Sequence, residues 1–512
     1  MMLALPGDVR ALLDALRGAG YPAYVVGGCV RDSVLGRTPQ DWDVCTAATP
    51  AAVRAALSQY AVVPTGLAHG TVTVVMAHRP YEVTTFRTEA GYSDHRRPDA
   101  VRFVGELRED LARRDFTINA MAYHPDEGLI DPFGGQADLV ARMVRCVGEA
   151  SARFTEDALR MLRALRFAAV YGFTLAQETA QAVHALCGQL RYVSMERVWA
   201  ELRKLLCGDG AAAMLAAFPD ALCAVLPELA GAGAGIGTGA GMGITARGRT
   251  GEASVGTGAT AWERTGEAGA WRRTARAVGY APAEPALRLA LLCHGAWPVD
   301  GLNMRGEAAC GLDARSEAAL RSMLRRLTCD NATRARVLRV LLTRGRALTA
   351  DTPSVLRLLR DLGEEGARDA LAFRRADALA SRAAGDGDAD GAWADTAEDR
   401  NTDGARAGDG NTDGAWAGTA GDGDTEDARL VMLAACERTL ARVLAEGRCY
   451  ALPMLAVDGG DLLAAGVAPG RAVGAALRAL LEAVIDGRVP NEKDALLVRA
   501  GEVISGEGRV EG

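Results

Sequence analysis

The sequence predicts an α+β protein, in which a small mixed-sheet head is followed by an all-helical neck, body and tail. Short runs rich in valine and threonine, which favour β-strands, are concentrated in about the first 140 of the 512 residues. Beyond them, apolar residues recur with the 3.6-residue period of amphipathic helices. The expected parts are a head at 1–140, a neck at 141–206, a body at 207–383 with an insert at 230–270, a second insert at 384–427, and a tail at 428–512.

The head is expected to combine one amphipathic helix with a five-stranded sheet. Residues 7–18 place Val9, Leu12, Leu13 and Leu16 on one side of a helix. An apolar run at 23–26 predicts a buried strand that ends in a tight turn at two glycines. Further strands are expected at 41–45 and, as a hairpin rich in valine and threonine, at 71–76 and 81–87.

Helical periodicity dominates the rest of the chain, at 155–170, 176–190, 195–206, 284–294, 315–327, 334–343, 429–446 and 472–486. The segments 230–270 and 384–427 are instead repetitive and rich in small or polar residues. Such composition buries too little apolar surface to offset chain entropy, so we expect two flexible inserts.

The charge distribution is compatible with an RNA partner. The net charge is −7, but the insert at 384–427 alone carries −11, which leaves +4 for the remaining residues. The sequence contains no run of about 18 uncharged apolar residues, so no membrane span is predicted. The first residues lack the features of a signal peptide, so a cytoplasmic location is expected. The eleven cysteines include no Cys-x-x-Cys pair, so no zinc or dithiol site is expected.

The turn after the first strand has the composition of a phosphate-binding turn. Gly27 and Gly28 let the backbone approach a ligand closely, and Arg31 adds a charge-assisted donor. Taken alone, the same string also fits an ordinary tight turn. The residues that follow the turn decide between these two interpretations.

Ten residues beyond Arg31, the sequence Asp41-Trp42-Asp43 places two carboxylates at i and i+2. On a strand these side chains point to the same face, where they repel each other unless a cation neutralises them. Magnesium is commonly held by one or two carboxylates together with substrate phosphates. Glu82 is a candidate third carboxylate on a neighbouring strand. An isolated Asp-x-Asp also fits a solvated strand, and the preceding glycine turn makes the metal interpretation more specific.

Together, residues 27–36 and 39–43 resemble the first motif of the class II CCA-adding enzymes and of the bacterial poly(A) polymerases, within the polymerase-beta-like nucleotidyltransferases. The stretches 113–122, 131–139, 153–167 and 196–202 resemble the second to fifth motifs, in that order. The resemblance covers about 190 residues and extends more weakly to 458–474 and Asn491. Many relatives also carry a His-Asp hydrolase domain, but His294 is followed by Gly295, so phosphohydrolase activity is not expected.

The resemblance implies a nucleotidyltransferase head that uses Mg²⁺, CTP and ATP, and a tail that binds tRNA. The catalytic set that it implies is Asp41, Asp43 and Glu82, with Asp41 and Asp43 as metal ligands. The nucleotide-binding set comprises Gly28, Arg31, Arg114, Asp157, Arg160, Arg163 and Arg166.

The fourth motif predicts how a base is selected. Residues 155–167 are expected to form a helix capped by Thr155, with Asp157 and Arg160 as neighbours on its surface. In an unrelated helix this pair is an ordinary salt bridge. As a protein template, the carboxylate accepts from the amino group of cytosine or adenine and the guanidinium donates to the adjacent ring nitrogen. Uracil and guanine present a carbonyl to the carboxylate and are rejected.

The predicted function is the addition of CMP and AMP to the 3′ end of tRNA, without a membrane or a stable protein partner. A poly(A) polymerase or an enzyme that adds only A is the alternative within the family. The loop at 92–99 resembles one that accompanies addition of the final A, which favours full CCA or A-only addition over addition of C alone. A catalytically inactive RNA-binding protein and a nucleotide-sensing regulator are further alternatives, and the retained site residues argue against the former.

Overall fold

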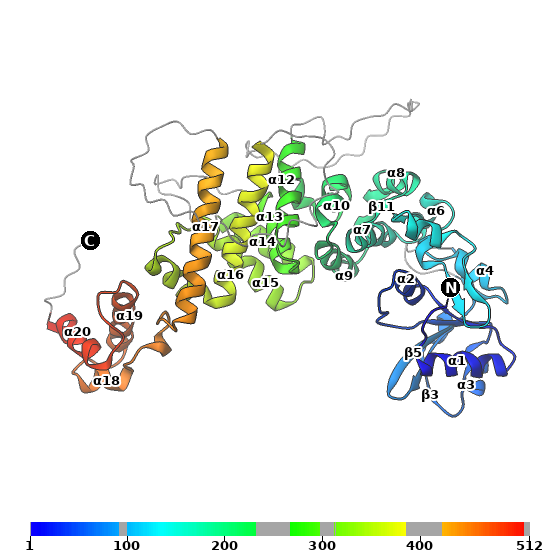
Figure 1. Cartoon of the computed structure of the whole chain (residues 1–512), viewed down its shortest axis with the longest axis horizontal. Helices are drawn as coiled ribbons and strands as arrows, with labels where there is room; N and C mark the ends of the chain where they lie inside the picture. Colours follow the sequence, from blue (N-terminus) through cyan, green and yellow to red (C-terminus); the bar gives the residue numbers. More distant parts are fainter. Residues whose placement is uncertain are drawn as a thin grey trace. The chain divides into compact units, whose positions relative to one another are not determined.

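The computed structural model describes residues 2–91, 100–231, 267–296, 312, 314–385 and 422–505. It divides into two compact units, Met1–Ala230 with Met323–Cys329 and Gly231–Ser322 with Asp330–Gly512. Strands lie in the first unit, and the described part of the second unit is helical (Figure 1). The α+β fold class is therefore confirmed. The loop at 92–99 and most of the two predicted inserts lie outside the described residues, and the division into neck, body and tail stays a prediction.

The head contains one seven-stranded sheet with the order β3-β4-β5-β2-β1-β8-β9. Its strands are β1 (Ala23–Val26), β2 (Val44–Thr46), β3 (Ala61–Gly66), β4 (Thr71–Met76), β5 (Arg79–Thr85), β8 (Ala122–His124) and β9 (Gly128–Ile130). β2 and β5 are parallel, and the other neighbouring pairs are antiparallel. The first residue of β2, Val44, consequently lies beside Val83 in the middle of β5. A separate pair is formed by β6 (Arg87–Ala90) and β7 (Ala100–Phe103).

The expectation of five strands is wrong: the sheet has seven, and β3, β8 and β9 match none of the strands named from the sequence. Every residue of β3 is exposed or half-buried and one is Pro64, as suits the edge of a sheet. β9 has only three residues and begins at Gly128, whose φ is 78°. The strand expected at 41–45 begins instead at Val44.

The predicted apolar side of the first helix is confirmed. α1 (Gly7–Gly18) buries Val9, Leu12, Leu13 and Leu16 and contacts β1 and α3 (Pro50–Ala56). β4 alternates along its length, with every second side chain buried. The turn after β1 leads into α2 (Gly28–Val34), and α4 (Leu107–Ala112), η2 (Thr117–Asn119) and α5 (Gly135–Val140) complete the head.

The helices that follow the head in the first unit are α6 (Ala150–Glu156), α7 (Leu159–Tyr171), α8 (Gln177–Leu186), α9 (Met195–Leu206), α10 (Ala211–Ala217) and α11 (Pro219–Val225). The helix expected over 155–170 is broken between α6 and α7, because Asp157 is extended (φ −143°, ψ 103°). Its carboxylate accepts a hydrogen bond from the Leu159 amide at 3.1 Å, a local bond that competes with the helix. Thr155 is therefore not a cap; its hydroxyl donates to the Ser151 carbonyl inside α6.

The second unit is built from helices around a core of its own. They are α12 (Glu267–Tyr280), α13 (Pro285–His294), α15 (Asn331–Thr343), α16 (Thr352–Gly385), α17 (Asp422–Ala445), α18 (Gly459–Ala464), α19 (Arg471–Ile485) and α20 (Lys493–Ser505), while α14 (Ala314–Arg326) crosses the division between the units. Within the described ranges, no helix is both long and apolar enough to span a membrane.

Replacing Gly135 by Ala should destabilise the head. The added Cβ would lie 2.2 Å from the Thr117 carbonyl oxygen, so α5 could not pack on η2 without moving backbone. Overpacking of this kind costs about 1–3 kcal/mol, which corresponds to a fall in Tm of roughly 2–10 °C for a unit of this size. Thermal unfolding followed by circular dichroism measures the shift. Gly105→Ala, where a Cβ meets nothing within 4 Å, is the control, and equal Tm values for the two variants would contradict the packing argument.

Candidate active site

Three carboxylates lie near one another where β2 begins beside the middle of β5. Asp41 and Asp43 lie in the segment immediately before β2, and Glu82 lies on β5. The parallel register pairs Val44 with Val83, so the residues one step earlier, Asp43 and Glu82, lie side by side. The Asp43 carbonyl accepts from the Val26 amide at 3.0 Å, which ties this segment to β1. The carboxylate pair therefore precedes the strand rather than lying on it, and the neighbouring strand supplies Glu82 as expected.

The charges at this edge act on one another. The pKa of Asp43 is raised, first by desolvation and then by the negative charge of Glu82, with a smaller contribution from Asp41. Arg114 opposes the rise. All three carboxylates are nevertheless exposed, so a ligand can reach them. An ion or substrate that brings positive charge to this edge is stabilised there.

The carboxylates fit a hard divalent cation. Oxygen ligands on neighbouring acids are the donors such ions prefer, and a cation would relieve the repulsion around Asp43. Over the ranges that the structure describes, no three or more His, Cys, Asp or Glu side chains are grouped so that they could hold a metal ion together. Asp41 and Asp43 are the ligands that the sequence predicts for such an ion, with Glu82 beside Asp43.

The glycine turn brings a second group to the site. Gly27 has φ 81°, and a Cβ there would lie 3.0 Å from Nη1 of Arg114, so glycine allows the guanidinium to approach the turn. Arg114 forms a salt bridge to the buried Asp110 at 3.2 Å. Burial would lower the pKa of Arg114, but Asp110 outweighs it and the pKa is raised. Arg114 is consequently a fixed positive charge near Asp43.

Arg31 is buried and bonded more extensively than a simple phosphate contact would require. Its guanidinium donates to Asp32 at 2.9 and 3.0 Å and to Oδ1 of Asn119 at 2.6 Å. It also lies over the rings of Phe167 and Tyr171, with 5.1 and 4.8 Å to the ring centroids. Arg31 thus joins the turn after β1 to α7. Gly28, three residues earlier in the helix, leaves the space that the Arg31 guanidinium approaches.

Asp157 and Arg160 do not pair with each other. The Asp157 carboxylate instead accepts two hydrogen bonds from Arg197 of α9, at 2.7 and 3.3 Å. Arg160 donates to Glu156 at 2.6 Å and to the carbonyls of Arg153 and Arg113 at 3.3 and 3.2 Å. The break between α6 and α7 removes the i, i+3 geometry on which the expected pair depended, so that expectation is wrong. Both groups remain half-buried and able to bind a further partner.

Arg163 and Arg166 project from α7 toward shared partners. Arg163 donates twice to Oδ2 of Asp115, at 2.6 and 2.9 Å. Arg166 donates to Glu201 of α9 at 2.8 Å and lies 3.6 Å from the centroid of the Phe167 ring. These arginines are therefore part of an ionic network that joins α7 to the head and to α9.

Asp115, Asn119, Arg197 and Glu201 are site residues to which the sequence analysis assigned no role. Asp115 is 8% exposed and also accepts from the Phe116 amide at 2.8 Å and from Nδ2 of Asn119 at 3.0 Å. Burial alone would raise the pKa of Asp115, but Arg163 and Asn119 lower it to about 2. All four lie in the motifs, yet only the fold shows which charged side chain each one contacts.

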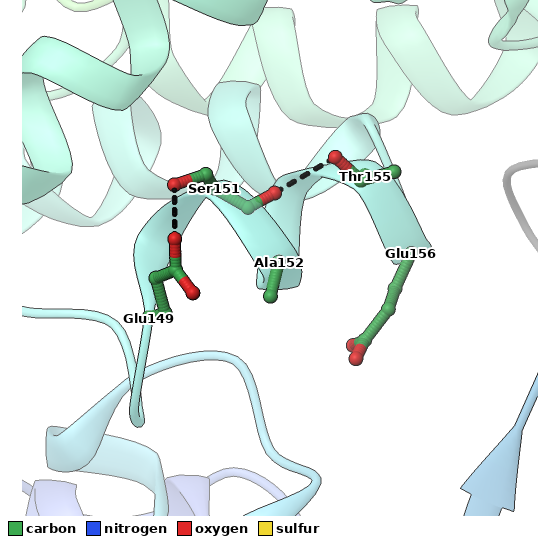
Figure 2. Close-up of a pocket in the computed structure, with 5 residues that line it drawn as sticks. All are labelled: Glu149, Ser151, Ala152, Thr155 and Glu156. Atoms are coloured by element: carbon green, nitrogen blue, oxygen red, sulfur yellow. Dashed lines mark hydrogen bonds between the residues drawn. The ribbon is translucent and has the colours of Figure 1, made fainter.

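A pocket of about 470 Å³ lies against α6 (Figure 2). Glu149, Ser151, Ala152, Thr155 and Glu156 line it, and Ser151 donates to Glu149 at 3.0 Å. One of them, Glu156, contacts a predicted nucleotide residue through its ion pair with Arg160. The pocket therefore lies beside Glu156, which holds Arg160. Asp41, Asp43 and Glu82 are not among its lining residues.

Three family profiles match the chain in order. Residues 23–145 match the poly(A) polymerase head domain, and residues 172–230 match a segment described as a probable RNA and SrmB-binding site of polymerase A. Residues 449–500 match domain 2 of the tRNA nucleotidyltransferases. The first match contains both predicted metal ligands, and the other two lie in helical parts of the chain.

Individual proteins with similar sequences are CCA-adding enzymes. The chain is 49% identical over 220 residues to the CCA-adding enzyme of Geobacillus thermodenitrificans, which covers 43% of this chain and 54% of that protein. For the CCA-adding enzyme of Lactiplantibacillus plantarum the identity is 47% over 212 residues, covering 41% and 52%. The chain thus spans about half the length of the curated relatives that it matches.

A solved structure extends the likeness to the whole chain. The crystal structure of the Bacillus stearothermophilus CCA-adding enzyme in complex with CTP is 29% identical, covers 98% of this chain and 99% of that one, and has a TM-score of 0.65. Residues 23–145 thus match the poly(A) polymerase head domain, and the chain is similar to CCA-adding enzymes in sequence over about 220 residues and in fold along its length.

Proposed function

We propose that this protein adds CMP and AMP to the 3′ end of tRNA, using CTP and ATP and releasing pyrophosphate. The observation that carries the proposal is the proximity of Asp41, Asp43 and Glu82 where β2 begins beside the middle of β5. A CCA-adding enzyme crystallised with CTP is one protein of known structure that this chain resembles along its length. Because tRNA and both triphosphates are cytoplasmic compounds, the cytoplasm is the location that goes with this proposal.

The family implies a divalent metal ion, and we propose that the ion is Mg²⁺ held by Asp41 and Asp43. When bound, such an ion activates the attacking hydroxyl and neutralises charge on the leaving pyrophosphate. Glu82, beside Asp43, adds negative charge that keeps a cation at this edge. Arg114 offers the triphosphate a positive charge that Asp110 holds in place.

Base selection is assigned to Asp157 and Arg160 acting as separate groups. The carboxylate accepts from the exocyclic amino group of cytosine or adenine, and the guanidinium donates to the ring nitrogen beside it. Arg163 and Arg166 bind phosphate or sugar in this proposal. The direct assay offers tRNA lacking CCA, lacking the final A, or complete, each with CTP, ATP or both. CCA addition predicts ordered extension that stops after three nucleotides, whereas poly(A) synthesis would continue with ATP alone and ignore CTP.

Asp41→Ala should abolish incorporation of both CMP and AMP. The substitution removes one of two metal ligands, and the reaction needs the same ion for either nucleotide. Binding of tRNA, measured by filter retention, should survive because the ion serves chemistry rather than docking. Asp126→Ala, which removes a carboxylate with a side chain 73% exposed, should retain activity. Normal incorporation by the Asp41 variant would exclude Asp41 as a metal ligand.

Asp157→Ala should lower the preference for CTP over UTP while leaving measurable catalysis. The change removes an acceptor for the amino group and a repulsion against the uracil carbonyl. An unpaired or mismatched polar group costs about 1–3 kcal/mol, so the ratio of kcat/KM values should fall roughly 5- to 150-fold. Arg160→Ala should instead weaken all four nucleotides. An unchanged CTP-to-UTP ratio in the Asp157 variant would exclude the protein template.

A further inference from the structure

Arg197 makes the strongest side-chain contact of the proposed base-reading carboxylate. Nη2 of Arg197 donates to Oδ2 of Asp157 at 2.7 Å, and Nη1 donates to Oδ1 at 3.3 Å. The two residues are 40 positions apart in the chain and come together because α9 packs against α7. Their side chains are 24% and 15% exposed, so the pair is only partly screened by water. A forked contact of this kind fixes the plane of the carboxylate as well as its position.

The hydrogen bonds of Asp157 leave a defined acceptor position. A carboxylate has about four lone-pair sites, two on each oxygen. Oδ1 accepts from the Leu159 amide at 3.1 Å and from Nη1 of Arg197, and Oδ2 accepts from Nη2 of Arg197. One site therefore remains, on Oδ2. A single donor such as an exocyclic amino group can occupy it, whereas a base carbonyl brought there would face a carboxylate that cannot turn away.

Arg160 cannot supply the same restraint. Its guanidinium is held by Glu156 and by the carbonyls of Arg113 and Arg153. The acceptor and the donor of the proposed template thus have separate supports, one on α9 and the other on α6 and the end of α4. Loss of the α9 support would free the carboxylate to rotate about the Leu159 bond without disturbing Arg160.

We infer that Arg197 is a positioning residue that determines base specificity, because it orients Asp157 so that Oδ2 accepts one hydrogen bond from cytosine or adenine and repels uracil. The inference rests on the proposed function. Arg197 touches no reacting atom; it acts through Asp157. Its removal should therefore change the choice of nucleotide more than the chemical step.

The test compares Arg197→Gln, Arg197→Lys and the control Arg203→Gln in the full-length protein with tRNA lacking CCA. Arg203 lies on the same helix, is exposed, and undergoes the same change of charge. The CTP-to-UTP ratio of kcat/KM should fall roughly tenfold in Arg197→Gln, since a charge-assisted bond is lost. The ratio should fall less in Arg197→Lys, because lysine can keep one donor to the Asp157 carboxylate but cannot form the forked contact. The control should keep the ratio of the parent protein and a similar Tm.

A double-mutant cycle separates positioning from a general structural role. If Arg197 acts through Asp157, Arg197→Gln should change the ratio less than about twofold in an Asp157→Ala background. A tenfold fall that persists in that background would overturn the inference, as would a parent-like ratio in Arg197→Gln. If Arg197→Gln does not fold, the Arg197→Lys ratio and its own cycle with Asp157→Ala decide the question. If Asp157→Ala has the same CTP-to-UTP ratio as the parent protein, the protein template itself is refuted. If Asp157→Ala changes that ratio but Arg197→Gln does not, only this inference is refuted.

Discussion

The arrangement of the site depends on one buried carboxylate, Asp115. Taking a carboxylate out of water costs several kcal/mol unless its lone pairs are occupied by good donors. Here all are occupied: the Phe116 amide and Asn119 bind one oxygen, and Arg163 binds the other twice. The depressed pKa of Asp115 records how strongly these donors favour the ionised form. Because the donors come from η2 and α7, the charge can be buried only when these two elements are docked.

The network grows from Asp115 in two directions. On one side, Asn119 accepts a hydrogen bond from Arg31 of α2, which connects the helix after the glycine turn to η2. On the other, Arg163 and Arg166 share Glu201 of α9, at 3.5 and 2.8 Å. The rings of Phe167 and Tyr171 fill the space between the guanidinium groups. The proposed catalytic edge of the sheet and the proposed base-reading segment between helices are thereby held by alternating charges rather than by an apolar core alone.

Local chemistry made much of this predictable from the sequence. The glycine turn, the Asp41 and Asp43 pair and the apolar side of α1 follow from short-range patterns, and the structure has the last of these as expected. β3 and β9 were not predictable, because an exposed edge strand and a three-residue strand carry no alternation. The partners of Asp157 and Arg160 were not predictable either. They depend on one extended residue and on long-range packing between α7 and α9, neither of which leaves a periodic signal.

The helix break at Asp157 also affects how base preference can change during evolution. Arg160 donates to the Arg153 carbonyl in α6, so the side chain that would read a ring nitrogen also helps to close the end of a helix. A substitution of Arg160 therefore changes base recognition and helix stability together, and selection for stable folding opposes it. Asp157 lies outside regular helix, and Arg197 reaches it from a different element. Drift in specificity therefore has an easier route through the acceptor and its α9 support than through the donor.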